Sequence, residues 1–127
     1  MNILLAYNDT DSSNRALERA AQLAELTGAR VVVTSVTPVV IGAASGEPGP
    51  ELQKAGETLR SRGLEVELVE AIGDIPAAIV EVAESRNVDL IVLGTREPSQ
   101  VERMLGHSVS ESVQRMAHCD VLIVHPR

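Results

Sequence analysis

One stretch decides the fold: Asp89-Leu90-Ile91-Val92-Leu93-Gly94-Thr95-Arg96, followed after a polar loop by Gly106-His107-Ser108-Val109-Ser110-Glu111. Residues 90–93 are apolar at every position, which is typical of a strand that is buried on both faces. A glycine, a loop and a capped helix come next. In α/β proteins this arrangement brings the free N–H groups of a helix to the end of a strand, where they can hold an anion.

Strand and helix patterns alternate along the rest of the chain. Apolar runs predict five strands, at residues 3–7, 31–36, 64–68, 90–93 and 121–124. Helical spacing predicts four helices between them. The first is capped within 11–13 and closed by Gly28, the second covers 51–62, and the last two are capped by Asp74 and Ser108. We expect a single domain over residues 1–127.

Such alternation predicts an α/β fold with a parallel sheet covered by helices on both faces. Right-handed crossovers favour the doubly wound strand order 3-2-1-4-5. The first and fourth strands are then neighbours, and ligands of such folds lie beyond the carboxyl ends of the strands where the winding reverses. Residues 8–13 and 94–110 are therefore expected to line a cleft.

Composition narrows the classes of function. Apolar residues make up 44% of the 127 residues, but there is no Phe or Trp and only one Tyr, so the core is aliphatic. Scarce aromatic rings and a net charge of −7 disfavour a nucleic-acid partner. No apolar run is long enough to span a bilayer, no signal peptide precedes the first strand, and one cysteine cannot form an internal disulfide. We expect a cytoplasmic protein with no membrane partner.

The fifth strand predicts a homodimer. It is an edge strand in the expected order, yet Val121, Leu122, Ile123 and Val124 are apolar on both faces. A bare apolar edge invites pairing with another chain. The simplest cover is the same strand of a second subunit.

Two interpretations of the expected cleft stay open. Gly94 either cradles a phosphate or only permits a tight turn, and neither common glycine-rich phosphate motif is present. Ser108, Val109, Ser110 and Glu111 form a capping box, whose serine either only caps the helix or also faces a phosphate. Arg96 is either an anion clamp or a solvated loop residue.

Signs of catalysis are weak. His107, His118 and His125 lack the spacing of metal ligands, and no serine nucleophile motif is present. Asp120 follows Cys119, and a neighbouring carboxylate raises the pKa of a thiol, so this cysteine is interpreted as inert. Asp9, Asp11 and Asp74 are interpreted as helix and turn caps. We therefore expect no catalytic residues, no metal and no required cofactor.

Residues 3–12, 73–89 and 116–124, together with the strand and capped helix within 89–111, resemble the universal stress protein family. Residues 3–12 resemble its ILVAVDGSEAS, residues 73–89 its GDPAEEI…ADLIVMG, and residues 116–124 its HAPCPVLVV. The strand and capped helix resemble its DLIVxGSRG and LGSVSExV. The resemblance covers the whole chain and implies the same doubly wound fold.

The nucleotide-binding branch of that family carries the pattern G-x2-G-x9-G-[ST]. Aligned without a gap, its first glycine falls on Gly94 and its serine on Ser108, but its other glycines fall on Glu97 and His107. Gly106 replaces the third glycine only if the loop is one residue shorter. The branch's first-strand aspartate falls on Asn8, and its small residue on Asp9. Val36 occupies the position whose backbone meets adenine in that branch.

The resemblance implies a homodimeric, non-catalytic module of stress response or signalling. Its cleft binds an adenine nucleotide (ATP, AMP or cyclic AMP) weakly or not at all. The alternative is an ATP-binding switch of the same family, with slow hydrolysis. The expected nucleotide-binding residues are Ala6, Asn8, Thr10, Val36, Gly94, Arg96, Gly106, His107, Ser108, Val109 and Ser110.

The departure at Glu97 generates a first prediction. Glu97→Gly removes a charge and a side chain where outer phosphates would lie, and two like charges about 4 Å apart repel by roughly 1 to 4 kcal/mol. We expect ATP affinity to rise by more than AMP affinity when wild type and variant are titrated with both nucleotides. Equal gains would mean that Glu97 does not face the phosphates.

Overall fold

The computed structural model describes residues 1–37, 49–95 and 108–126. In this part of the chain, strands and helices alternate. The strands are β1 (Asn2–Ala6), β2 (Arg30–Thr37), β3 (Val66–Ile72), β4 (Leu90–Gly94) and β5 (Asp120–Val124). The helices are α1 (Asp11–Thr27), α2 (Pro50–Arg60), α3 (Ile75–Ser85) and α5 (Val109–Met116). The predicted α/β class is confirmed.

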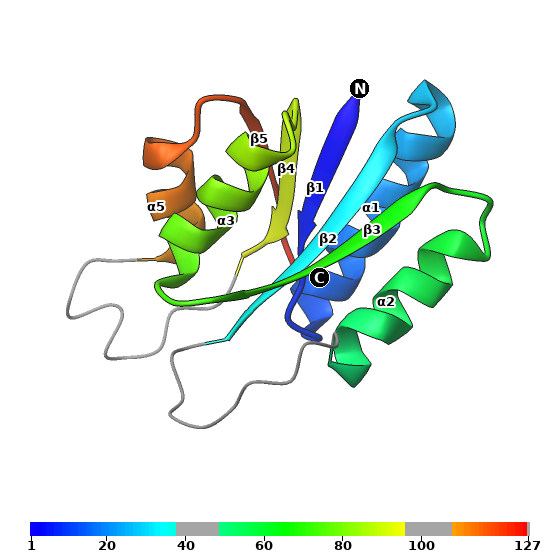
Figure 1. Cartoon of the computed structure of the whole chain (residues 1–127), viewed down its shortest axis with the longest axis horizontal. Helices are drawn as coiled ribbons and strands as arrows, with labels where there is room; N and C mark the ends of the chain where they lie inside the picture. The colour runs from blue at the N-terminus through cyan, green and yellow to red at the C-terminus, as the bar shows by residue number, and fades with distance from the viewer. Residues whose placement is uncertain (38–48, 96–107, 127) are drawn as a thin grey trace.

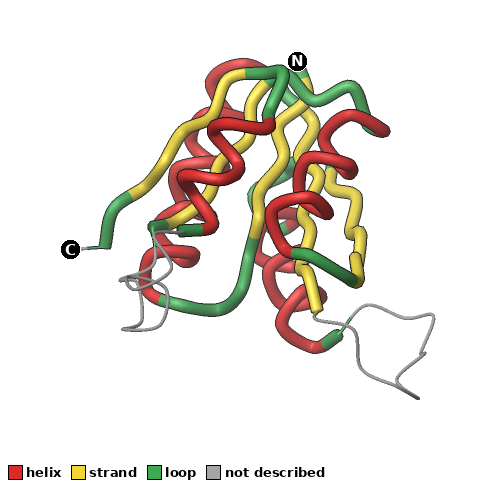
Figure 2. Tube along the Cα trace, turned by 90° about the vertical axis from the view of Figure 1, so that its left-hand side faces the viewer, coloured by secondary structure: helices red, strands yellow, loops and turns green. Residues whose placement is uncertain are grey.

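All strand pairs are parallel, and the order is β3-β2-β1-β4-β5, as predicted. β1 is central, with Leu4 opposite both Val32 of β2 and Ile91 of β4. The strands run downward in Figure 1 from the end that carries the N-terminus. Their carboxyl ends therefore lie at the same end of the sheet. Figure 2 shows the helices flanking the strands.

One face of the sheet packs against α1 and α2. Leu5 of β1 and Val33 of β2 meet Leu17 of α1 and Leu52 and Leu59 of α2 in one apolar cluster. Leu52 and Leu59 face inward, as the helical spacing of apolar residues within 51–62 indicates, and both are almost fully buried. This cluster is aliphatic except for Tyr7, as the composition predicted.

The other face packs against α3 and α5. Leu4, Val32 and Ile91 of the sheet contact Ile79 of α3 and Val113 of α5. Each helix therefore has a buried apolar stripe, and the sheet is covered on both faces. β3 and β5 are the two edge strands.

Two local predictions differ from the structure, namely the bounds of the third strand and the cap of the first helix. β3 begins at Val66 and extends to Ile72, not 64–68, because β2 runs to Thr37 and offers a hydrogen-bonding partner for each added residue. The cap of α1 is Thr10, whose hydroxyl accepts from the N–H of Ser13 at 3.3 Å, rather than a residue within 11–13. Boundaries of this kind depend on pairing and cap geometry, which a periodicity does not contain.

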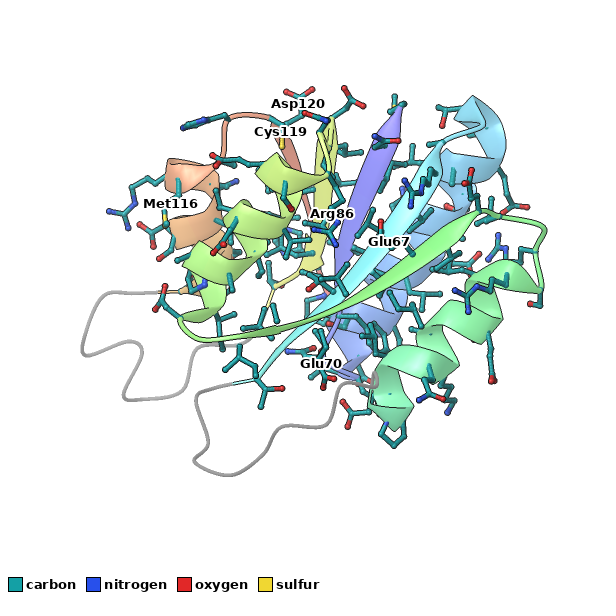
Figure 3. The ribbon with its side chains drawn as sticks, in the orientation of Figure 1. Glu67, Glu70, Arg86, Met116, Cys119 and Asp120 are labelled. Atoms are coloured by element: carbon teal, nitrogen blue, oxygen red, sulfur yellow. The ribbon has the colours of Figure 1, made fainter. Side chains whose placement is uncertain are left out.

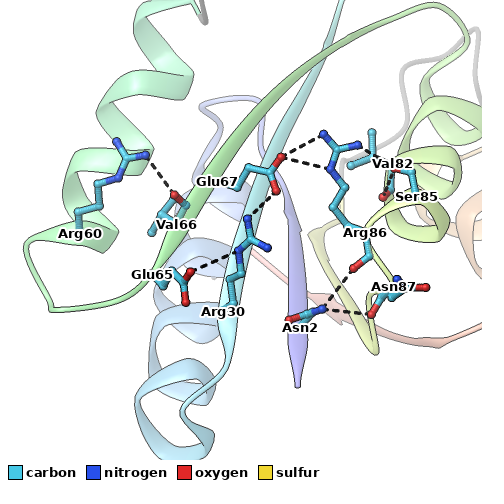
Figure 4. Close-up of polar contacts among 10 residues, drawn as sticks. All are labelled: Asn2, Arg30, Arg60, Glu65, Val66, Glu67, Val82, Ser85, Arg86 and Asn87. Atoms are coloured by element: carbon cyan, nitrogen blue, oxygen red, sulfur yellow. Dashed lines mark hydrogen bonds and ion pairs between the residues drawn. The ribbon is translucent and has the colours of Figure 1, made fainter.

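Glu67 of β3 is partly buried and is held by arginines from two other elements. It accepts hydrogen bonds from Arg30 of β2 at 2.8 Å and from Nη2 of Arg86, which caps α3, at 3.0 Å (Figure 4). Figure 3 shows Glu67 and Arg86 directed toward one another. The carboxylate ties the edge strand to its neighbour and to a helix.

Gly94 marks the closest approach between two layers. A Cβ at this position would lie 2.5 Å from the backbone carbon of Ser12 and 2.6 Å from its hydroxyl. The first turn of α1 therefore rests directly on the end of β4. Gly94 is not among the described glycines with a positive φ, so close packing, rather than a left-handed turn, requires the glycine.

We predict that Gly94→Ala lowers the free energy of unfolding by about 1 to 3 kcal/mol, because its methyl group meets backbone that cannot yield. Urea denaturation measures the loss. Gly56→Ala is the matched control: its Cβ would lie 2.8 Å from the flexible tip of Leu68, and a helical alanine gains up to about 1 kcal/mol. Equal losses in the two variants would contradict the packing role of Gly94.

Candidate functional site

A cleft opens at the carboxyl ends of the central strands. It encloses about 590 Å³, counting the open solvent at its mouth. Its wall comes from the ends of β1, β2 and β4 and from the starts of α1, α3 and α5. The lining residues are Ala6, Tyr7, Asn8, Ser13, Thr34, Val36, Ile75, Ile79, Leu93, Gly94, Ser108, Val109 and Ser110.

Most of the residues predicted from the sequence come together in this wall. They are Ala6, Asn8, Val36, Gly94, Ser108, Val109 and Ser110. Thr10 is not a lining residue, but its hydroxyl donates to Oδ1 of Asn8 at 2.8 Å. Arg96, Gly106 and His107 lie outside the described residues, as does Glu97.

Sequence reasoning missed five residues of the wall, which are Tyr7, Thr34, Ile75, Ile79 and Leu93. Two signals could have found some of them. Thr34 and Val36 are two positions apart in a strand and share a face, and Ile75 and Ile79 are one helical turn apart. Tyr7 gives no such signal, because its apolar ring belongs to the cluster against α1 and α2.

Three helix N-termini converge on the cleft. Ser13 lies in the first turn of α1, Ile75 begins α3, and Ser108 caps α5. The Ser108 hydroxyl accepts from the N–H of Glu111 at 3.1 Å, as the capping box predicted. The side chain of Glu111 pairs instead with Arg115, at 3.5 Å. Helix N-termini favour negative or polar groups, so the cleft attracts such groups through its backbone.

Asn8 is fixed in the wall by two hydroxyl groups. Its Oδ1 accepts from Thr10 at 2.8 Å and from the Ser13 hydroxyl, and its backbone N–H donates to Ser13 Oγ at 3.3 Å. The two hydroxyl donations to Oδ1 are hydrogen bonds that a carboxylate would also accept at this position. The amide thus keeps the local geometry and presents no negative charge.

Tyr7 connects the wall to the loop that follows β1. Its hydroxyl lies 3.0 Å from Asp9 Oδ1 and 2.7 Å from Asn14 Oδ1, and its N–H donates to the carbonyl of Thr34. A phenol has one proton, so the network closes when Tyr7 donates to Asp9 and the Asn14 amide turns to donate its own N–H. Burial, followed by the hydrogen bond and charge of Asp9, raises the pKa of Tyr7 to about 12. The hydroxyl therefore remains a donor at neutral pH.

Asp74, Asp9 and Cys119 do not line the cleft. Asp74 caps α3 by accepting from the N–H of Ala77 at 3.2 Å, as predicted. Asp9 is not a helix cap; it has a φ of 55° and holds Tyr7. Cys119 lies at the opposite end of the sheet, beside Asp120 in Figure 3. Burial, and then Asp120, raise the pKa of its thiol.

Two features are absent from residues 1–37, 49–95 and 108–126. No three His, Cys, Asp or Glu side chains there are grouped as metal ligands would be. No helix in the same ranges has the length and apolar character that a membrane crossing needs.

Proteins of one known family are similar to this chain in sequence or in fold. A universal stress protein of Methanocaldococcus jannaschii is 34% identical, with 96% of this chain and 80% of that protein aligned. YxiE, a universal stress protein of Bacillus subtilis, is 33% identical over 96% of this chain and 97% of its own length. A solved universal stress protein in complex with cAMP superimposes with a TM-score of 0.80 at 28% identity, covering 100% of this chain and 98% of that one. The family model described as the universal stress protein family matches residues 1–125, and the chain therefore belongs to this family.

Proposed function

We propose that this universal stress protein is a homodimeric, non-catalytic module of stress response or signalling in the cytoplasm, with a cleft that binds an adenine nucleotide weakly. One observation carries the proposal. The described wall presents hydroxyl, amide and apolar groups, and none of its side chains is a carboxylate, imidazole, thiol or cation. Such a wall suits a base and a ribose better than a chain of phosphates or a reaction that transfers protons.

The two halves of the wall support this ligand class. Val36, Ile75, Ile79 and Leu93 offer an apolar surface for a flat ring, and Asn8, Ser13 and Ser108 offer polar groups for a sugar or a single phosphate. The similar protein that was solved with cAMP supports a cyclic or singly phosphorylated nucleotide as the ligand here.

An ATP-binding switch is the second candidate. The convergence of the N-termini of α1, α3 and α5 favours it, because each supplies roughly half a positive charge. Three such termini attract phosphate, but the cationic side chains that usually accompany a triphosphate are not in the described wall.

Titration calorimetry with ATP, AMP and cyclic AMP, with and without Mg²⁺, distinguishes the two candidates. We expect an ATP dissociation constant of about 0.1 mM or weaker, near −5.5 kcal/mol, and binding of AMP or cyclic AMP that is at least as tight. ATP binding at micromolar levels that depends on Mg²⁺ would favour the switch. No binding of any of the three would reject a nucleotide site.

The proposed dimer uses the β5 edge. Val121, Leu122 and Ile123 are only partly buried, and this strand pairs with β4 alone in the described sheet. The β3 edge is different, because it carries Glu67 and Glu70. Charged side chains block pairing between edges, so the apolar edge is the one suited to a second copy.

We predict that Ile123→Lys gives a monomer in light scattering, because it places a charge in an apolar pairing edge. Glu70→Lys makes a change of charge on the opposite edge strand and should leave the dimer intact. A wild-type protein that is monomeric at tens of micromolar would refute the proposed interface.

A further inference from the structure

We propose that a groove at the amino end of the sheet is a docking site for a basic side chain, lysine or arginine, from a segment of a partner protein. The groove lies between the C-terminal ends of α3 and α5, whereas the cleft lies at their N-terminal ends. This inference goes beyond the proposed function, because it assigns a second site that shares no lining residue with the cleft.

The floor of the groove is apolar. The groove encloses about 520 Å³, counting the open solvent at its mouth. Lysine and arginine carry a stem of methylene groups before the charge, and such stems lie along apolar surface while the charged head stays in water. A floor of this kind therefore suits the stem of a basic side chain. The apolar lining residues are Val80, Ala83, Val88, Ile91 and Ala117.

The charge at the groove is negative. Glu84 lines it, and its partner His118, at 3.3 Å, offsets that charge only when the imidazole is protonated. Burial raises the pKa of the Cys119 thiol, which also lines the groove, and nearby charges raise it further. Those charges belong to Asp120, Asp89 and Glu84. Asp120 and Asp89 do not line the groove, but they add their field to that of Glu84.

Two helix ends strengthen this field. α3 ends at Ser85 and α5 at Met116, each beside residues that line the groove. Figure 1 shows both ends where β4 and β5 begin. A helix C-terminus carries roughly half a negative charge, so two of them favour a cation at this end of the sheet.

The cations nearest in sequence are engaged elsewhere. Arg86 follows α3, but its guanidinium donates to Glu67 of β3 at 3.0 Å. Arg115, in the last turn of α5, pairs with Glu111 at 3.5 Å. No lysine or arginine of the described chain lines the groove. The groove is therefore complementary to a cation that the described chain does not supply.

The balance of charge indicates the source of that cation. The whole chain has a net charge of −7, so its field attracts a basic partner and repels a second copy of itself. One exposed ion pair contributes little alone, so a free cation would dissociate readily. A protein segment adds contacts beyond the groove, because its backbone stays outside while the side chain enters.

An NMR titration of the full chain tests the groove. The probe is the acetylated amide of alanine-arginine-alanine, and the matched uncharged probe carries citrulline in place of arginine. At low ionic strength we expect the arginine probe to shift the amide signals of Ala83 and Ala117, with a dissociation constant of about 1 to 10 mM, and to leave that of Ser108 in the cleft unchanged. The citrulline probe should bind at least about fivefold more weakly, with a smaller difference in about 0.5 M salt.

Two variants separate the groove from the general charge of the protein. Glu84→Gln removes the lining charge and keeps the side-chain size, and should weaken binding of the arginine probe by at least about threefold. Glu81→Gln is the matched control, because it makes the same change three residues earlier on α3, at an exposed position that does not line the groove. It should weaken binding by less than about 1.5-fold.

Four outcomes would overturn the inference. They are equal binding of the arginine and citrulline probes, equal losses in Glu84→Gln and Glu81→Gln, and tighter binding of free agmatine than of the peptide, which would make the occupant a small cation. The fourth is a shift of the same signals with protein concentration alone, which would make the occupant a second copy. Nucleotide titrations of Glu84→Gln should match those of the wild type, so the proposed function stands or falls separately.

Discussion

The contact between Gly94 and Ser12 is the constraint on which the cleft depends. With no side chain at Gly94, the first turn of α1 rests on the end of β4, and a Cβ would come within 2.5 Å of its backbone. This contact packs the start of α1 against β4, the neighbour of β1, at the point where the winding reverses. It also brings Ser13 and Asn8 to the same wall as Ser108. A glycine that resembles a phosphate-binding residue is therefore required by packing, whatever ligand occupies the cleft.

The hydrogen bonds of the first loop follow from this placement. Thr10 caps α1 and also donates to Asn8, so one hydroxyl both terminates a helix and orients a residue of the wall. Ser13, in the first turn of the helix, donates to the same oxygen. Because the partners are neutral, they order the wall without adding charge to it. The charges nearby lie outside the wall, as Asp9 does.

The sequence was sufficient to predict the fold, because alternating periodicities and right-handed crossovers leave few topologies for five strands. The inward stripe of Leu52 and Leu59 and the caps at Asp74 and Ser108 were predictable for the same reason, since each depends on local spacing. The extent of β3 was not, because β2 determines how far it pairs. The hydrogen bonds of Tyr7 could not be predicted either. Its ring fits an apolar core, and its hydroxyl contacts Asp9, a residue with left-handed backbone.

Asn8 and Asp9 differ from the family pattern in where the first loop carries its carboxylate. In the family pattern that this chain resembles, an aspartate ends the first strand and a small residue follows it. Here the amide takes the strand end, and the carboxylate moves one residue along. At position 8 the amide oxygen accepts the hydroxyls of Thr10 and Ser13 and brings no charge to the wall. At position 9 the carboxylate accepts the hydroxyl of Tyr7, whose ring belongs to the cluster against α1 and α2. The loop therefore keeps its carboxylate, but the carboxylate is not a residue of the cleft wall.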